Sequence, residues 1–388
     1  MIREDIIKNR FKIIVPYIYG NRKILFEKYF NRYLNEFSTV GFRFMKQTLE
    51  VDMLLSHVSE MLEQILYYDC DLRSGTVSKA VDEPHLALER IEVYHFPTNI
   101  GFITFDIGFD NSMNITEIIH SMNKMLSSIE TGKGVHADSS GDYDENLIVS
   151  KVESMLDILK ELELFPTTKR KSCFWYQMLI AKINEAQAFS LRHINNDGTV
   201  AIGYMPTRND DVETELKIDK LHECHLTAKG MGLITNLNLA AIKDNPEDTR
   251  QEEIFRLEYN TSFFLAFLLL QHERLLLLTY KKRMLTLKEN GRRESEALKT
   301  SILNCLSCYT FQSISDDANC QLIYSGYRGL LKLSQDEEIM SNIIFKIDDE
   351  LGKKKEQRVT VLSLLLALLG IVSIVSSVLD ILTFFMDK

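Results

Sequence analysis

The C-terminal region contains an uncharged segment that is long enough to cross a membrane. Residues 359–379 read VTVLSLLLALLGIVSIVSSVL and include no charged residue. As a helix rising about 1.5 Å per residue, this segment is ~31 Å long, which matches the hydrocarbon thickness of a bilayer. A helix in the core of a soluble protein normally keeps a polar face, and this segment has none. We therefore predict one transmembrane helix over residues 359–386.

A basic cluster directly before this segment predicts its orientation. Residues 353–358 read KKKEQR, with four cations and one anion. Positive charge beside a membrane helix stays on the cytoplasmic side. The N-terminal sequence MIREDIIKNR is charged from its start and lacks the apolar core of a signal peptide. We expect a single-pass protein of the cell (inner) membrane with residues 1–358 in the cytoplasm.

Composition restricts the classes of partner and chemistry. The chain has 388 residues and a formal net charge of −10, which argues against nucleic acid as a partner. Six cysteines without a dense framework fit a reducing compartment. Two Cys/His groups, His222–His225 and Cys305–Cys308 with Cys320, lack the second half-site of a zinc motif. The sequence contains no hydrolase or kinase motif. We therefore predict no metal site and no enzyme activity.

Residues 1–246 combine helical and strand-like patterns. A helical stripe of apolar residues covers residues 50–68. Two apolar runs within residues 90–109 flank the turn Pro97–Gly101 and predict a β-hairpin. Further strand-like segments are 11–18, 173–180, 199–205 and 225–234. We expect an α+β cytoplasmic domain with one mixed or antiparallel sheet, which senses a ligand.

Residues 247–358 have a different character, because no strand pattern and no proline follow Pro246. Residues 252–289 include FFLAFLLLQHERLLLLTY, which is apolar on nearly every side. Gln271–Arg274 interrupt this run, and each central charge would cost roughly 2.5–3.5 kcal/mol in a membrane. We predict a buried bundle helix here, and a second helix over residues 293–310.

A third helix is predicted to run from Asp316 into the membrane segment without a break. Through Leu379 it would be ~96 Å long, too long for one protomer to support. Neighbouring protomers are therefore expected to hold it, which predicts a homo-oligomer. Apolar residues that recur every three or four positions form a packing stripe: Ile323, Leu330, Leu333, Met340, Ile344, Ile347 and Leu351.

This order of parts resembles the CorA family of divalent-metal channels. That family has an α/β cytoplasmic domain, antiparallel helices and one long stalk helix that enters the membrane. The helix over residues 252–289 and the stalk over residues 316–358 correspond to those helices. The resemblance implies a ring of protomers, a pentamer in CorA itself, with the membrane helices around a central pore. It also implies a divalent cation as a ligand.

Two features of that family are missing. The Gly-Met-Asn signature is absent, and the nearest strings, Gly230-Met231-Gly232 and Ser112-Met113-Asn114, lie far from the membrane segment. The second membrane helix is absent too, because residues 359–386 are too few for two crossings. Both departures argue against Mg²⁺ transport. Some CorA-like proteins are antiviral, CRISPR-associated membrane effectors switched by a nucleotide second messenger, and the resemblance extends that role to this chain by analogy.

The membrane segment has one face of small and polar residues: Ser363, Leu366, Gly370, Ser373, Ser377 and Asp380. One interpretation is a weakly polar pore lining with a ring of carboxylates at the outer mouth. The other is a seam of small residues for helix packing. Both interpretations require an oligomer.

A basic run beside the only tryptophan is the candidate ligand site. Lys169, Arg170 and Lys171 precede Trp175. Cations beside an aromatic ring suit a small anionic nucleotide, since charge and stacking act together. The alternative is a solvated charge run ahead of a core strand.

Three functions follow from these features, in this order. The first is a homo-oligomeric ion channel or pore, gated by a ligand on the cytoplasmic domain. The second is a membrane-anchored sensor or scaffold that does not conduct. The third is a membrane-tethered enzyme without a recognisable motif. Divalent-cation transport is a further alternative, which rests on the resemblance alone.

Overall fold

The computed structural model describes most of the chain with gaps. For some of the described residues only the backbone is described. In the last helix, side chains are described as far as Gly370. The described residues are 9–18, 45–47, 54–72, 86–109, 113, 118, 121–122, 124–125, 128–129, 143–161, 174–180, 222–226, 230–234, 238–243, 249–286 and 292–386.

The chain forms two compact units. The first comprises Met1–Leu276 and Tyr309–Leu333, and the second comprises Leu277–Cys308 and Ser334–Lys388. Two helices therefore run from one unit into the other. The predicted division into residues 1–246, 247–358 and 359–386 stays a prediction.

The first unit is built on a nine-stranded sheet in the order β2-β3-β4-β5-β1-β6-β9-β8-β7. Neighbouring strands are antiparallel, except that β6 and β9 are parallel. This confirms the expected N-terminal sheet. The strands are β1 Asn9–Ile18, β2 Met45–Gln47, β3 Leu66–Asp71, β4 Leu86–His95, β5 Ile100–Phe109, β6 Phe174–Ile180, β7 His222–Leu226, β8 Gly230–Ile234 and β9 Asn238–Lys243.

The predicted hairpin is confirmed. Strands β4 and β5 pair antiparallel, and Asn99 has a φ of 66° in the turn between them. This left-handed conformation is one that asparagine adopts more readily than most residues. The single strand expected over residues 225–234 is instead the hairpin β7–β8. The strand predicted at 199–205 lies outside the described residues, and β9 was not predicted.

The helix predicted over residues 50–68 is wrong at both ends within the described residues, because Leu54 and Leu55 precede the helix and the residues after Leu62 leave it. Helix α2 covers Ser56–Leu62, and Leu66 already begins β3. The stripe of apolar residues continues past the turn, but Tyr67 pairs with Tyr94 of β4 and their ring centroids are 4.9 Å apart. This cross-strand pairing outweighs the local helical period.

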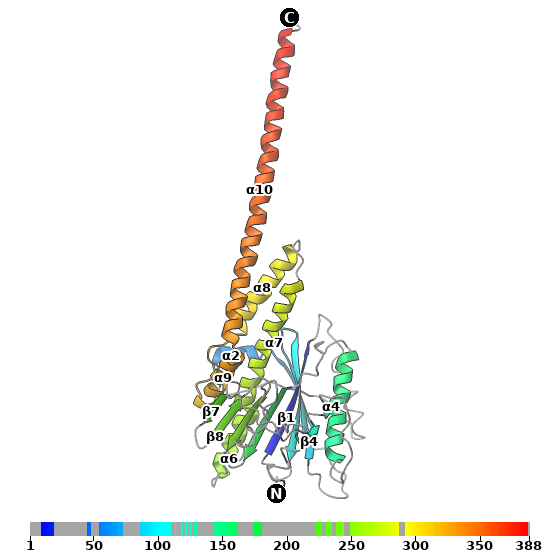
Figure 1. Cartoon of the computed structure of the whole chain (residues 1–388), viewed down its shortest axis with the longest axis vertical. Helices are drawn as coiled ribbons and strands as arrows, with labels where there is room; N and C mark the ends of the chain where they lie inside the picture. The colour runs from blue at the N-terminus through cyan, green and yellow to red at the C-terminus, as the bar shows by residue number, and fades with distance from the viewer. Residues whose placement is uncertain are drawn as a thin grey trace, which may run out of the picture. The chain divides into compact units, whose positions relative to one another are not determined.

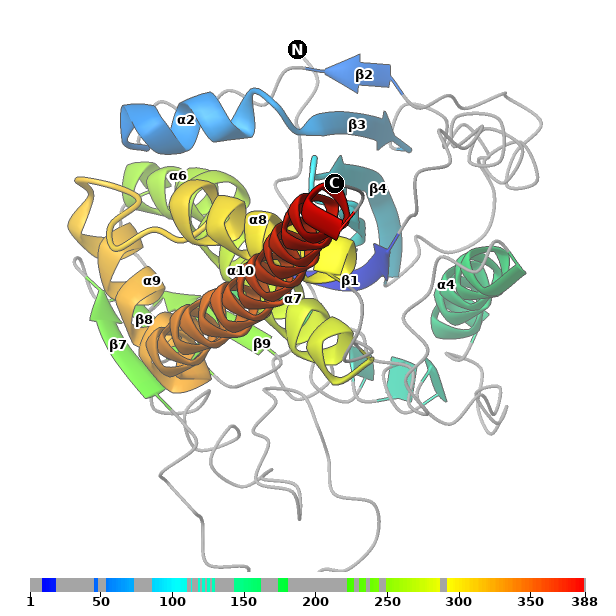
Figure 2. The same cartoon turned by 90° about the horizontal axis from the view of Figure 1, so that it is seen from above.

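Two layers of helix cover the sheet. Helix α4 (Tyr143–Glu161) and the first part of α7 (Phe264–Thr286) lie on opposite sides of β1 and β4 (Figures 1 and 2). Alternate side chains of a strand point to opposite faces, so β1 contributes to both layers. Phe11, Ile13 and Val15 are completely buried in the apolar core. The other face carries Lys12, which is also buried.

The C-terminal region is mostly helical, as expected, and no strand follows β9 in the described residues. Helix α9 lies beside β7 and β8 (Figure 2). The remaining helices are α6 Thr249–Glu258, the π-helix η3 Tyr259–Phe263, α8 Arg292–Cys308, α9 Ala318–Leu331 and α10 Leu333–Met386.

The prediction of an unbroken third helix is wrong at Lys332. This residue has a φ of 55°, in the left-handed region, and forms the C-cap of α9. Its backbone N–H bonds to the carbonyl of Gly329 at 3.1 Å, which closes α9 in the usual geometry of a helix C-terminus. Helix α10 then begins at Leu333, has 54 residues and is ~81 Å long.

The apolar stripe of α10 is buried within the protomer. Met340 is fully buried, and Ile344 and Ile347 are 8% and 9% exposed. Ion pairs within the second unit also hold α10, since Asp336 pairs with Lys281 of α7 and Asp348 pairs with Lys299 of α8. This part of the stripe therefore needs no second protomer, and the homo-oligomer stays a prediction.

Candidate functional site

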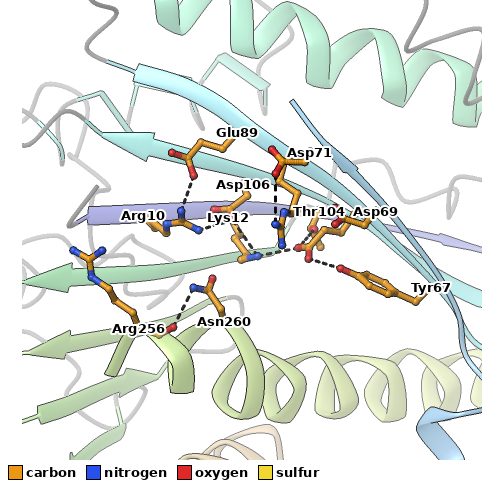
Figure 3. Close-up of polar contacts among 12 residues, drawn as sticks. Arg10, Lys12, Tyr67, Asp69, Asp71, Glu89, Thr104, Asp106, Arg256 and Asn260 are labelled. Carbon is orange, nitrogen blue, oxygen red and sulfur yellow. Dashed lines mark hydrogen bonds and ion pairs between the residues drawn. The ribbon is translucent and has the colours of Figure 1, made fainter. Parts of the chain in front are cut away.

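A group of charged side chains lies on the sheet face covered by η3 and α7 (Figure 3). We call it the sheet charge cluster. Strand pairing makes its members neighbours, because Asp106 lies opposite Lys12 on one side and Arg90 on the other. Its members are Arg10 and Lys12 of β1, Asp69 and Asp71 of β3, Glu89, Arg90 and Glu92 of β4, and Asp106 of β5.

A β-bulge completes the cluster. The register of β4 against β5 shifts between Leu88 and Arg90, which leaves Glu89 as the extra residue. A bulge redirects the side chain at its position. The Glu89 carboxylate lies 2.7 Å from Arg10, whose guanidinium also contacts Asp106 at 3.2 Å.

Lys12 and Glu92 form the centre of the cluster. The Lys12 ammonium lies 2.9 Å from Glu92 and 3.3 Å from Asp106, and 4.8 Å from the ring centroid of Phe264. Glu92 also accepts hydrogen bonds from Tyr67 at 2.9 Å and Thr104 at 3.0 Å. Two opposite charges are thus buried with satisfied hydrogen bonds, which is the condition for holding them away from water.

Lys12 and Glu92 favour each other's charged forms, and the directions of their pKa shifts agree with this. Burial alone would raise the pKa of Glu92, but Lys12, the hydrogen bond from Tyr67 and Arg90 together outweigh burial and lower it to about 2. Burial alone would lower the pKa of Lys12, but Asp106 and Glu92 raise it. The pKa values of both groups lie far from pH 7. The centre of the cluster is therefore not suited to proton transfer near neutral pH.

The cluster has more acidic than basic members. Among the described residues, five carboxylates face three cations, and Asp106 Oδ1 is buried without a hydrogen bond from any of them. Burial is the main cause that raises the pKa of Asp69. The side chains of Arg90 and Asp71 are 33% and 39% exposed, so the cluster reaches solvent at that end. A surplus of negative charge disfavours phosphate groups, which makes the cluster a poor nucleotide site.

The π-helix η3 lies over this face and has its own side-chain support. A π turn leaves the carbonyls of the preceding turn without their usual partners four residues on. Three consecutive side chains take their place: Asn260 bonds to the Arg256 carbonyl at 3.0 Å, Thr261 to that of Leu257 at 2.6 Å, and Ser262 to that of Glu258 at 3.4 Å. Asn260 and Arg256 point toward the cluster side of the helix in Figure 3.

Helix α7 carries three consecutive polar residues that are all buried, and each has a partner. Gln271 bonds to the Tyr327 hydroxyl. His272 Nε2 lies 2.6 Å from the Thr98 hydroxyl, and its ring stacks on Phe96 with centroids 4.0 Å apart. Glu273 accepts two bonds from Arg328 at 2.8 and 2.9 Å. These partners come from α9 and the β4–β5 turn. A helix in a protein core needs such partners for its buried polar side chains.

By length and composition, one helical stretch among the described residues could cross a membrane. It is Glu253–Leu285, and 78% of its apolar window is buried inside the protein. This stretch contains the three anchored polar residues of α7. The interpretation of residues 252–289 as a buried helix accounts for all of these contacts.

Helix α10 passes through the predicted membrane segment and presents a different surface. Every valine and leucine side chain from Val359 to Leu369 is at least half exposed, with values from 50% at Leu368 to 66% at Leu369. A Cβ on Gly370 would meet nothing within 4 Å. This segment therefore has no packing partner within the described part of the chain.

The predicted pore residues all lie on α10. Ser363, Leu366 and Gly370 are exposed. Ser373, Ser377 and Asp380 are helical, and their side chains lie outside the described residues. The six positions stay a prediction.

The predicted ligand residues are described only in part. Lys169, Arg170 and Lys171 lie outside the described residues. Trp175 lies in β6, and its backbone is opposite Ile13 of β1. Among the described side chains, no three His, Cys, Asp or Glu residues form a group that could hold a metal ion.

Sequence reasoning did not find the sheet charge cluster. Arg10 and Lys12 alternate with apolar residues in β1, which is the usual pattern of a strand with one solvated face. The helix that covers this face is more than 230 residues away in the sequence. Only the long apolar segment of α7, which needs a surface to cover, signalled such a layer.

Comparisons of the chain with known protein families, with characterised proteins and with solved structures found no match.

Proposed function

We propose that this chain is a homo-oligomeric, CorA-like membrane protein that forms an ion channel or pore. In this proposal α10 crosses the cell membrane once, and the rest of the chain is cytoplasmic. A ligand bound to the N-terminal domain gates the pore, and a nucleotide second messenger of antiviral defence is the ligand class that we favour.

The observation that carries the proposal is the surface of α10. Eight valine and leucine side chains between Val359 and Leu369 each expose at least half of their surface area. Each fully buried side chain of this kind gains roughly 1.5–3 kcal/mol on leaving water. A single protomer leaves that free energy unused, whereas lipid or neighbouring α10 helices would recover it.

A path of contacts in the first unit supports gating by the N-terminal domain. Helix α7 lies on the sheet through Phe264, and its Glu273 holds Arg328 of α9. Only Lys332 separates α9 from α10. A ligand that shifts the sheet against α7 would therefore act on Lys332 and the start of α10, the helix that also contains the proposed membrane segment.

The charge of the sheet charge cluster guides the choice of ligand site. The described members of this cluster are five carboxylates and three cations, a balance that disfavours an anionic nucleotide. Lys169, Arg170 and Lys171 with Trp175 remain the better candidates for that ligand, because they offer cations and a stacking ring.

A non-conducting membrane sensor or scaffold is the second candidate. The open space beside Gly370 favours it as much as a pore, because small residues let two helices approach closely. In that case Ser363, Gly370 and Ser377 would form a helix–helix seam. Divalent-cation transport is the weakest alternative, since the family signature is absent.

Ion flux from proteoliposomes tests the proposal. Purified full-length protein should release a trapped cation when the gating ligand is added. In the open state Ser377→Cys should react with a water-soluble thiol reagent, and Val375→Cys should not, because only the first lies on the predicted pore face. Asp380→Lys should reduce cation flux more than Asp387→Lys. Equal reactivity of the two cysteines, with unchanged flux in Asp380→Lys, would favour the scaffold.

A further inference from the structure

Helix α10 changes charge sharply just before its apolar segment. Asp348, Asp349 and Glu350 form an acidic turn, and residues 353–358 then contain four cations and one anion. The whole chain has a formal net charge of −10, so this basic segment stands against the general balance. We call residues 353–358 the basic collar.

The collar lies at the depth of lipid headgroups if Val359 begins the hydrocarbon-spanning part. At about 1.5 Å per residue, Lys355 is ~6 Å and Lys353 ~9 Å from Val359 along the helix axis. The headgroup region of one leaflet is about 5–7 Å thick. Lys355 therefore lies within the headgroup region and Lys353 just beyond it, within the reach of a flexible lysine side chain.

The basic positions of the collar are concentrated on one side of a helical wheel. With successive positions about 100° apart, positions 353, 354, 355 and 358 fall within an arc of about 200°, and position 356, a glutamate, falls outside it. The order of residues therefore does not place the acidic position between the basic ones.

The described cations of the collar are accessible. Lys355 is exposed, and the side chain of Lys353 is 67% exposed. Lys353 pairs with Asp349 at 2.5 Å, and Asp349 is itself 63% exposed. Such an exposed pair is weak and readily exchanged, since solvent screens it on both sides.

We propose that the basic collar binds the phosphate groups of anionic phospholipids in the cytoplasmic leaflet. This inference rests on the proposed membrane crossing of α10 but not on conduction. It assigns the protein a lipid preference: each collar lysine adds attraction to an anionic surface, worth about a fivefold change in association per lysine.

Competition between spin-labelled phosphatidylglycerol and phosphatidylcholine for full-length protein in bilayers measures this preference. Wild-type protein should favour phosphatidylglycerol, and 0.5 M NaCl should reduce the preference because the charges are screened. Replacing Lys353, Lys354 and Lys355 with Gln should remove most of it, a loss of up to about 100-fold in relative association.

Single variants on the same helix provide a matched comparison. Lys355→Gln should lower the preference about fivefold, whereas Lys346→Gln should change it less than twofold. Both lysines are exposed on α10, but Lys346 lies ~20 Å from Val359, about twice the screening length at 0.1 M salt. Equal effects of the two variants would overturn the inference.

Two further outcomes separate this inference from the proposed function. If the protein inserts into both lipids without preference, the collar is not a lipid site, and the membrane crossing stands. If the protein inserts into neither, both proposals fail. Glycerol 3-phosphate in solution should not displace the labelled phosphatidylglycerol; displacement at millimolar concentration would identify a site for soluble phosphates instead of lipid.

Discussion

Helix α7 and residues 359–370 of α10 are both apolar on nearly every side, yet their described surroundings differ. In α7, the polar residues Gln271, His272 and Glu273 are buried and bonded to other elements. In α10, the polar side chains within residues 359–370 are the hydroxyl groups of Thr360 and Ser363. The valine and leucine side chains of this segment are exposed. Hydrophobicity alone therefore does not show whether an apolar helix lies in the core of the protein. The buried and paired polar side chains identify α7 as a core helix.

The largest expected effect tests the anchors of α7. Glu273→Leu leaves Arg328 buried without its carboxylate and should lower the free energy of unfolding by about 3–5 kcal/mol. Urea unfolding followed by circular dichroism measures this. Glu273→Leu combined with Arg328→Met should recover most of the loss, because the buried unpaired charge is gone.

That double variant also provides the contrary result. If it is as unstable as Glu273→Leu alone, then Arg328 is not the reason for the loss, and the account of α7 as a helix held by polar anchors needs revision.

A smaller effect concerns pH. Burial lowers the pKa of His272 to about 3, so the folded protein keeps this ring neutral. The unfolded chain takes up a proton near pH 6.5, so stability is complete above that pH and falls as pH decreases toward 3, by at most about 1.4 kcal/mol per pH unit. His95, whose pKa burial lowers to about 4, acts in the same direction.

Urea unfolding at pH 7.5 and pH 5.0 measures this loss. His272→Gln can keep a hydrogen bond to Thr98 and should reduce the pH dependence, leaving the contribution of His95. Membrane insertion of α10 should be equal at both pH values, because residues 359–379 contain no ionisable side chain. An unchanged slope in His272→Gln would show that the ring is not the group that titrates.

The smallest expected effect separates two roles of Gly370. A Cβ at this position meets open space in the protomer, so Gly370→Ala should stabilise the helix by about 0.5–1 kcal/mol if the residue faces lipid or a pore. Oligomer size in detergent should then be unchanged. Dissociation of the oligomer in Gly370→Ala would instead place Gly370 at a close helix–helix seam.

The sequence predicted the parts of the fold whose signals are local. The turn Pro97–Gly101 between two apolar runs predicted the β4–β5 hairpin, and the interrupted apolar run of α7 predicted a buried helix. The break at Lys332 was missed because its sequence, Leu-Leu-Lys-Leu, contains no glycine or proline at the cap. Lys332 takes the left-handed conformation at the end of α9, and the next residue, Leu333, is fully buried.

The candidate site depended on contacts that no local pattern contains. Lys12 and Glu92 are 80 residues apart in the sequence. Their side chains meet across β5, which lies between β1 and β4 in the sheet. Both residues alternate with apolar residues along their strands, a pattern that normally indicates a strand with one face exposed to solvent. The sequence did predict the uncharged segment of α10, because 21 residues without a charge are a local property that no distant contact alters.

The central claim is that residues 359–379 of α10 cross the membrane and that α7 does not. Extraction of cell membranes at alkaline pH, applied to full-length protein and to Leu365→Lys with Leu369→Lys, tests it most directly. Wild-type protein should remain with the membrane. The double variant should be released as a folded protein with an unchanged circular dichroism spectrum, because two charges oppose insertion by roughly 2.5–3.5 kcal/mol each. Retention of the double variant, together with release of Leu268→Lys, would identify α7 as the membrane helix and contradict the account.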